Sequence, residues 1–110
     1  MPGDLHAPAE GSAASGNVVL HGRITVSNSG EMRHALAQAL RAKPATVSVD
    51  LSDVSYIDTS GLATLVEAVR IARKQGMRLI LVGMKDQPRY LFEITHADGF
   101  FDTAEPEVNT

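Results

Sequence analysis

The sequence predicts one α/β domain, in which helices pack on a mixed, mostly parallel β-sheet of about four to five strands. Apolar runs of strand length alternate along the chain with amphipathic segments of helix length. A helix between two strands usually brings the second strand alongside the first in the same direction. The length of 110 residues suits a single domain, and a composition of 44% hydrophobic and 21% charged residues is typical of a soluble globular protein.

The first predicted strand covers residues 17–24, where apolar and β-branched side chains are frequent. Gly22 lies inside it and is typical of a bulge. Asn28, followed three residues later by Glu31, has the spacing of a capping box and predicts a helix that begins there and ends before Pro44.

The second strand and helix have the clearest patterns in the chain. Residues 45–51 alternate apolar and polar side chains, as in a strand, and Ser52-Asp53 predicts a turn after it. Apolar residues then recur at helical spacing until Gly76; they are Leu62, Leu65, Val66, Val69 and Ala72. This spacing leaves Thr64, Glu67, Ala68, Ile71 and Gln75 on the outward side of the helix.

The last part of the chain predicts a buried strand in 77–84, a short helix near 88–95 and a terminal strand at 100–101. Residues 1–15 are rich in Ala, Gly, Ser and Pro without periodicity, so we expect a flexible arm there, the domain over 16–103 and a short tail over 104–110. The sequence contains neither a signal-peptide pattern nor an apolar run of membrane length, so we expect a cytoplasmic protein that does not insert into membranes.

Composition argues against several classes of function. The formal charge of −3 is small and mixed, so no nucleic-acid surface is expected, and the absence of cysteine removes thiolate chemistry. The four histidines lack the i, i+4 pairing of helical metal sites. A serine nucleophile is disfavoured because the G-x-S-x-G pattern is incomplete, and Walker and dinucleotide glycine patterns are missing. We therefore expect no catalytic residue, no metal and no cofactor.

The connection between the second predicted strand and the following helix contains Asp58, Thr59, Ser60 and Gly61. It lies at the carboxyl end of the strand, where open α/β folds commonly place functional groups. Ser, Thr and Asp are also ordinary helix caps. Gly61 fits simple capping less well, because glycine early in a helix costs up to about 1 kcal/mol relative to alanine. An anion on a hydroxyl here would be tolerated by the positive end of the helix.

The stretch VSVDLSDVSYIDTSGLATLVEAVRIARKQGMRLILVGM resembles the STAS domain, which is shared by anti-sigma factor antagonists and the cytoplasmic part of sulphate transporters. The resemblance runs from about Val18 to Phe101 and centres on the five residues 58–62, Asp-Thr-Ser-Gly-Leu. Family members usually have another strand before the one at Val18. Either the sheet here is one strand short, or the arm pairs despite its composition.

The resemblance implies an anti-sigma factor antagonist that works by partner switching. Ser60, or alternatively Thr59, would be phosphorylated by a partner that is both a serine kinase and the anti-sigma factor. The unphosphorylated chain would bind this kinase and free a sigma factor, and a serine phosphatase would reset the switch. We expect the chain to be a monomer or a weak dimer.

The expected partner surface surrounds the serine and extends over the neighbouring loop and helix. It comprises Asp58, Thr59, Gly61, Leu62, Thr25, Ser27, Thr64, Ala68 and Ile71. Thr25 stands where relatives often have an acidic residue. The alternative function within the same fold is a STAS subunit of a membrane-transporter ATPase for lipid transport, or a stress-signalling scaffold.

Overall fold

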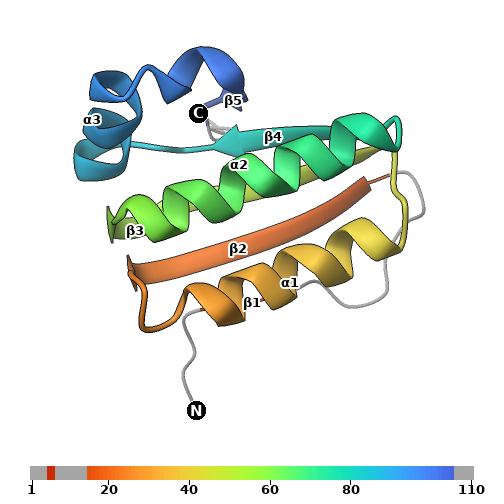
Figure 1. Ribbon diagram of the computed structural model, residues 1–110, viewed down its shortest axis with the longest axis horizontal. Helices are drawn as coiled ribbons and strands as arrows, with labels where there is room; N and C mark the ends of the chain where they lie inside the picture. Colours follow the sequence, from red (N-terminus) through yellow and green to blue (C-terminus); the bar gives the residue numbers. More distant parts are fainter. Residues whose placement is uncertain (1–4, 7–14, 106–110) are drawn as a thin grey trace, which may run out of the picture.

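The computed structural model describes residues 5–6 and 15–105, and in it two helices cover one face of a five-stranded sheet (Figure 1). The elements follow in the order β1 (Leu5–His6), β2 (Ser15–Ile24), α1 (Ser29–Arg41), β3 (Thr46–Ile57), α2 (Thr59–Lys74), β4 (Arg78–Val82), α3 (Asp86–Ile94), η1 (Ala97–Phe100) and β5 (Asp102–Ala104). The strands lie side by side in sequence order.

Strands β2, β3, β4 and β5 run parallel, and β1 joins the edge of β2 in the antiparallel direction. This arrangement confirms the predicted mixed, mostly parallel sheet. The strand β1 lies within the segment expected to be a flexible arm, so of the two alternatives left open by the sequence, the arm supplies the extra strand. Residues 1–4, 7–14 and 106–110 of the expected arm and tail lie outside the described residues.

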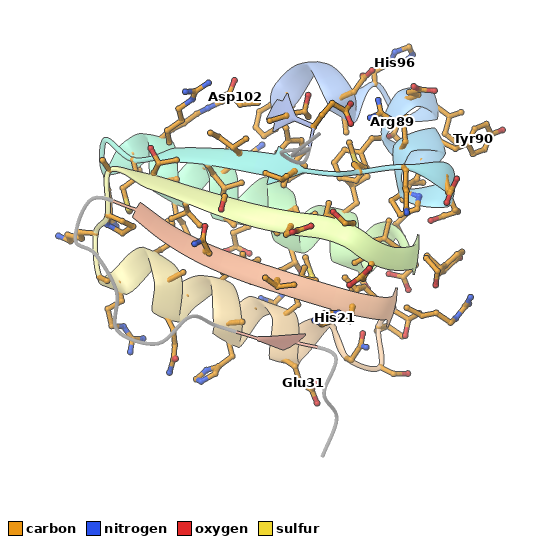
Figure 2. The ribbon with its side chains drawn as sticks, turned by 180° about the vertical axis from the view of Figure 1, so that it is seen from behind. His21, Glu31, Arg89, Tyr90, His96 and Asp102 are labelled. Carbon is orange, nitrogen blue, oxygen red and sulfur yellow. The ribbon has the colours of Figure 1, made fainter. Side chains whose placement is uncertain are left out.

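The core lies between the sheet and the helices α1 and α2. In β3, Val47, Val49 and Leu51 are fully buried on the helix side, while the intervening polar side chains are half-buried on the opposite side. In Figure 2 the face of the sheet that α1 and α2 do not cover is toward the viewer, and the two helices lie behind the strands. Because both helices connect parallel neighbours and pack on the same face, the strand ends that precede them lie together at one edge of the sheet.

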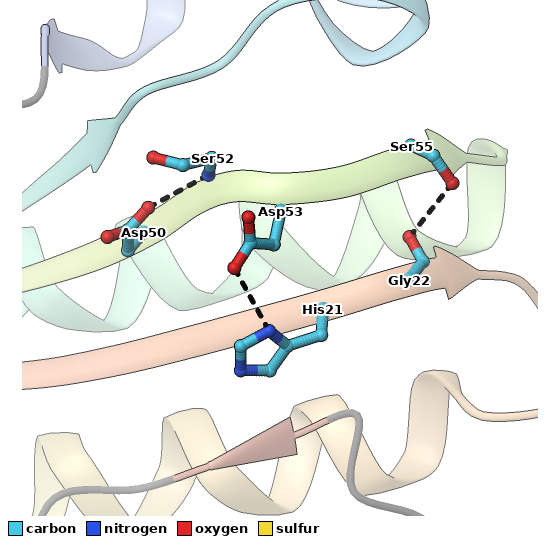
Figure 3. A network of polar contacts seen from close by, with 6 residues as sticks. All are labelled: His21, Gly22, Asp50, Ser52, Asp53 and Ser55. Atoms are coloured by element: carbon cyan, nitrogen blue, oxygen red, sulfur yellow. Dashed lines mark hydrogen bonds and ion pairs between the residues drawn. The ribbon is translucent and has the colours of Figure 1, made fainter.

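The predicted turn at Ser52-Asp53 is wrong, because β3 continues through these residues. The pairing of β2 with β3 shifts register between Val19 and His21, and this irregularity absorbs the polar residues without ending the strand. Asp50 Oδ1 accepts from the Ser52 N–H at 2.8 Å, and His21 Nδ1 lies 3.4 Å from Asp53 Oδ2 (Figure 3).

A bulge lies at Gly22 as predicted, where φ is 76° and the register shifts a second time, between Gly22 and Arg23, but its extra residue, Ser55, belongs to β3. The helix α1 begins after Asn28 as predicted, but the predicted capping box is wrong: the Asn28 side chain makes no cap hydrogen bond. It accepts instead from the Thr25 N–H at 2.9 Å and donates to the Arg23 carbonyl at 2.9 Å. The terminal strand begins two residues later than expected, after the short 3₁₀ helix η1.

Five residues of α2 and its C-cap were predicted to face outward. The prediction is confirmed for Glu67, Ile71 and Gln75, which are exposed, and it is wrong for Thr64 and Ala68, which are buried. The reason is that α2 packs on α1 as well as on the sheet, so its buried stripe is wider than the sheet contact alone requires.

Gly61 is buried where α2 starts, and its backbone approaches two fully buried side chains. A Cβ atom there would lie 2.7 Å from Ile57 Cγ1 and 3.0 Å from Ile24 Cγ2. This close contact explains a glycine that simple helix capping does not require.

Gly61→Ala is expected to lower the free energy of unfolding by about 1–3 kcal/mol, because the added methyl group overlaps the core beneath it. Gly30→Ala is the matched control in α1, since a Cβ there meets nothing within 4 Å. The control should be neutral or stabilising by up to about 1 kcal/mol. Urea unfolding measures both, and equal changes in the two variants would contradict the packing role of Gly61.

Candidate functional site

The candidate site is centred on Asp58, the residue between β3 and α2. Its backbone is extended, with φ −99° and ψ −176°, and its side chain caps α2. Oδ1 accepts from the Ser60 N–H at 2.9 Å and from the Gly61 N–H at 3.1 Å. The same oxygen accepts from the Ser60 hydroxyl at 2.6 Å. The carboxylate therefore fixes both the start of the helix and the orientation of the serine.

The second carboxylate oxygen of Asp58 holds the loop between β2 and α1. Oδ2 accepts from the Val26 N–H at 3.0 Å. The Asp58 N–H in turn donates to the Ile24 carbonyl at 3.0 Å, which extends the pairing of the two strands past the end of β3. One residue thus joins the ends of two parallel strands to the first turn of α2.

The loop itself closes on its own side chains. Thr25 Oγ1 accepts from the Ser27 N–H at 3.2 Å, and the Asn28 N–H donates to the Thr25 carbonyl at 3.0 Å. Val26 lies at the tip with its side chain exposed.

Helix α3 supports the site from the opposite flank. Strand β4 ends before it can pair with the last residues of β3, so the backbone of Ile57 would lack partners on that side. The Gln87 side chain replaces them: its Oε1 accepts from the Ile57 N–H at 2.9 Å and its Nε2 donates to the Ile57 carbonyl at 3.0 Å. This support fixes the residue directly before Asp58.

Hydrogen bonding keeps the Asp58 carboxylate ionised. The hydrogen bond from the Ser60 hydroxyl is the main cause that lowers the pKa of Asp58 below its ordinary value of 3.8. The backbone N–H groups of Gly61, Val26 and Ser60 act in the same direction, and partial burial opposes them. At neutral pH the site therefore presents a negative charge directly beside the serine.

The structure brings together most of the residues expected at the site. Asp58, Ser60 and Leu62 are half-buried at this edge, Thr59 is exposed and Gly61 is buried. On the neighbouring loop, Thr25 is half-buried and Ser27 is exposed. Ile71 is exposed farther along α2, whereas Thr64 and Ala68 face α1. The roles of these residues in partner binding stay predictions.

Two residues of the site were missed by reasoning from the sequence. Val26 follows the end of a strand in a polar loop, and only its apolar side chain among polar neighbours could have drawn attention to it. Gln87 gives no signal in the sequence, because its role depends on where β4 ends. Within residues 5–6 and 15–105, no group of three or more metal-ligating side chains lies together, and no helix is both long and apolar enough to cross a membrane.

A family model described as "Mlab, STAS domain" matches residues 9–102. The chain belongs to the STAS domain family. It is 30% identical over 95 residues to the anti-sigma-B factor antagonist of Listeria monocytogenes serovar 1/2a, which covers 84% of this chain and 83% of the relative. These comparisons confirm the resemblance found in the sequence.

The chain is also similar to a second relative of known name and to a solved structure. Over 39 residues the chain is 46% identical to the intermembrane phospholipid transport system binding protein MlaB of Escherichia coli, which covers 36% of this chain and 40% of the relative. The fold matches SpoIIAA, the Bacillus cell fate determinant, in its phosphorylated form, with a TM-score of 0.72 and 14% identity over 94% of this chain and 91% of that one.

Asp58→Ala is expected to lower the free energy of unfolding by about 1–2 kcal/mol, because it removes the helix cap. Asp58→Asn should cost less, since its amide oxygen still accepts from the N–H groups of Ser60 and Gly61 while only the bond to Val26 is lost. Urea unfolding at neutral pH compares the two variants. Equal losses would show that the cap on α2 is not what Asp58 contributes to stability.

The lowered pKa of Asp58 also predicts a dependence of stability on pH. The ionised carboxylate stabilises the folded state at neutral pH, and this contribution is lost as the pH falls below the ordinary pKa of 3.8 and through the lower pKa of the folded state. The difference in unfolding free energy between the wild type and Asp58→Asn should therefore shrink towards acid. Glu93→Gln, at an exposed position of α3, is the control. A difference that stays constant with pH would refute this expectation.

Proposed function

We propose that this chain is an anti-sigma factor antagonist whose binding to an anti-sigma serine kinase is controlled by phosphorylation of Ser60. The observation that carries the proposal is the Ser60 hydroxyl, which donates to Asp58 at the start of α2, at the edge where two strands end. Similarity to anti-sigma-B factor antagonists supports this function, as does a shared fold with a protein known in a phosphorylated form. The chain acts in this proposal as a regulatory substrate in the cytoplasm and not as an enzyme.

The proposed modification uses a nucleoside triphosphate as donor. The bond between Ser60 Oγ and the γ-phosphorus forms, and the bond from that phosphorus to the nucleoside diphosphate breaks, with its electron pair leaving on the diphosphate. The hydroxyl proton, which points to Asp58 in the unmodified chain, passes to a base of the kinase. A serine phosphatase reverses the modification by hydrolysis of the phosphate ester.

Electrostatics favours a switch in binding over a switch in folding. The phosphate adds about −1.5 to −2 charges at neutral pH, directly beside the ionised Asp58. The positive end of α2 stabilises an exposed anion by about 0.3–1 kcal/mol. Like charges forced together in an interface cost several kcal/mol. We therefore expect both forms to fold alike and to differ strongly in affinity for the kinase.

The second candidate function is that of a binding subunit of a phospholipid transport system. The observation that favours it is the 46% identity to MlaB, which is higher than to the anti-sigma-B factor antagonists but restricted to 39 residues. A transport subunit would bind its ATPase whether or not Ser60 carries a phosphate. Binding measured with both forms of the chain therefore separates the two candidates.

Incubation of the chain with a purified candidate anti-sigma kinase, ATP and magnesium is expected to add one phosphate, which mass spectrometry maps to Ser60. Ser60→Ala should abolish the modification, and Thr59→Ala, at the exposed neighbouring hydroxyl, is the matched control and should retain it. The phosphorylated chain should bind the kinase at least tenfold more weakly than the unmodified chain, with unchanged circular dichroism. Phosphate on Thr59 alone, or equal binding of both forms, would overturn the proposal.

A further inference from the structure

Val26 presents an unusually exposed apolar side chain next to the proposed switch. Its exposed fraction is 75%, the highest among the large hydrophobic residues in the described part of the chain. A single exposed apolar side chain is ordinary on a protein surface. This one, however, lies at the tip of a loop that hydrogen bonds of Thr25, Asn28 and Asp58 together hold in one conformation. A side chain fixed in this way loses little freedom when a partner covers it.

Val26 and Ser60 bind the two oxygens of the same carboxylate. The Val26 N–H lies 3.0 Å from Asp58 Oδ2, and Ser60 Oγ lies 2.6 Å from Asp58 Oδ1. One carboxylate therefore bridges the backbone of the loop and the serine hydroxyl. A macromolecule that docks over Ser60 Oγ therefore meets the loop that carries the exposed Val26 side chain.

The phosphate would act on both contacts of this carboxylate. When a phosphoryl group replaces the hydroxyl proton, Ser60 Oγ can no longer donate to Asp58, and two acceptor oxygens remain face to face. The phosphate oxygens also compete with Asp58 for the N–H groups at the start of α2. On the loop side, Val26 is joined to the Asp58 side chain by one hydrogen bond, so this bond is the first to be lost when the carboxylate turns away.

We infer that Val26 is an apolar contact for the partner that phosphorylates Ser60, and that Asp58 holds Val26 in place only while Ser60 carries its hydroxyl proton. The inference rests on the proposed function for its partner and adds to it a residue and a mechanism of release. Phosphorylation then weakens binding in two ways, by its charge and by loosening the apolar contact beside it.

The coupling can be tested without any kinase. Phosphoserine is installed at position 60 during expression by codon reassignment, and amide hydrogen exchange of Val26 is measured by NMR in the modified and unmodified chains. Loss of a hydrogen bond to a charged acceptor predicts roughly tenfold or faster exchange at Val26 in the phosphorylated chain. Exchange in the central residues of β3 should not change. Unaltered exchange at Val26 would overturn the coupling.

Asp58→Asn tests whether the Asp58 side chain links phosphorylation of Ser60 to the hydrogen bond of Val26. Asparagine keeps an oxygen for the first turn of α2 but presents an N–H₂ group to the Val26 N–H, so exchange at Val26 should already be fast and phosphoserine should not increase it further. A phosphate that still accelerates exchange at Val26 in this variant would show that Asp58 is not the link.

The contact is tested by the affinity of the unmodified chain for the kinase that modifies Ser60. Val26→Ser should weaken binding about tenfold or more, because a buried valine side chain is lost from the interface. Ile94→Ser is the matched control, since Ile94 is also exposed, at 54%, but lies on α3. Equal affinity of Val26→Ser and wild type would overturn the contact. If no kinase binds any form, the proposed function fails, and with it the contact, while the exchange experiment still decides the coupling.

Discussion

The structure around the site depends on the four hydrogen bonds that the Asp58 carboxylate accepts. Three reach Oδ1 from the first turn of α2 and one reaches Oδ2 from the loop before α1. Together they fix where α2 begins and how the serine hydroxyl points, and they tie the neighbouring loop to the end of β3, so one ionised group connects three segments at this edge.

The edge can be this precise because the core beneath it is closely packed. Ile24 and Ile57 end β2 and β3 and are both fully buried, and Gly61 lets the backbone of α2 approach them closely. On the other flank, Gln87 replaces the strand partner that Ile57 would otherwise lack. The polar residues of the site therefore lie on a closely packed apolar core. A change of charge among them affects contacts at the surface more than it affects the fold.

Much of this architecture is predictable from the sequence, because it follows from patterns that repeat over many residues. The alternation in β3 and the helical spacing in α2 fix the period, the burial and the order of the elements, and Gly22 and Gly61 mark a bulge and a close contact. The turn predicted at Ser52-Asp53 is wrong because two consecutive polar residues are typical of a turn, whereas here a register shift against β2 accommodates them within the strand.

Contacts between distant segments are what the sequence does not contain. Thr64 and Ala68 are small residues that a two-sided helix would expose, and only the position of α1 buries them. Asn28 begins a helix as its spacing predicts, yet its side chain turns back to close the loop that carries Val26. The hydrogen bond between Val26 and Asp58 is likewise not predictable from the sequence, because it joins residues 32 positions apart.

These contacts also decide where a modification can act. The buried hydrophobic cluster draws side chains from β2, β3 and β4 and from the helices α1, α2 and α3, and Ile24 and Ile57 belong to it. The proposed phosphate at Ser60 would interact with a carboxylate, a helix end and one loop, whose individual contributions to stability are about 1 kcal/mol each. Stability of a domain rests on many more contacts than these. A partner that covers the edge, by contrast, must desolvate the phosphate and Asp58 together. In the proposed mechanism, the same chemical event is therefore small on the scale of folding and large on the scale of binding, and this difference would allow a site built from ordinary capping residues to act as a switch.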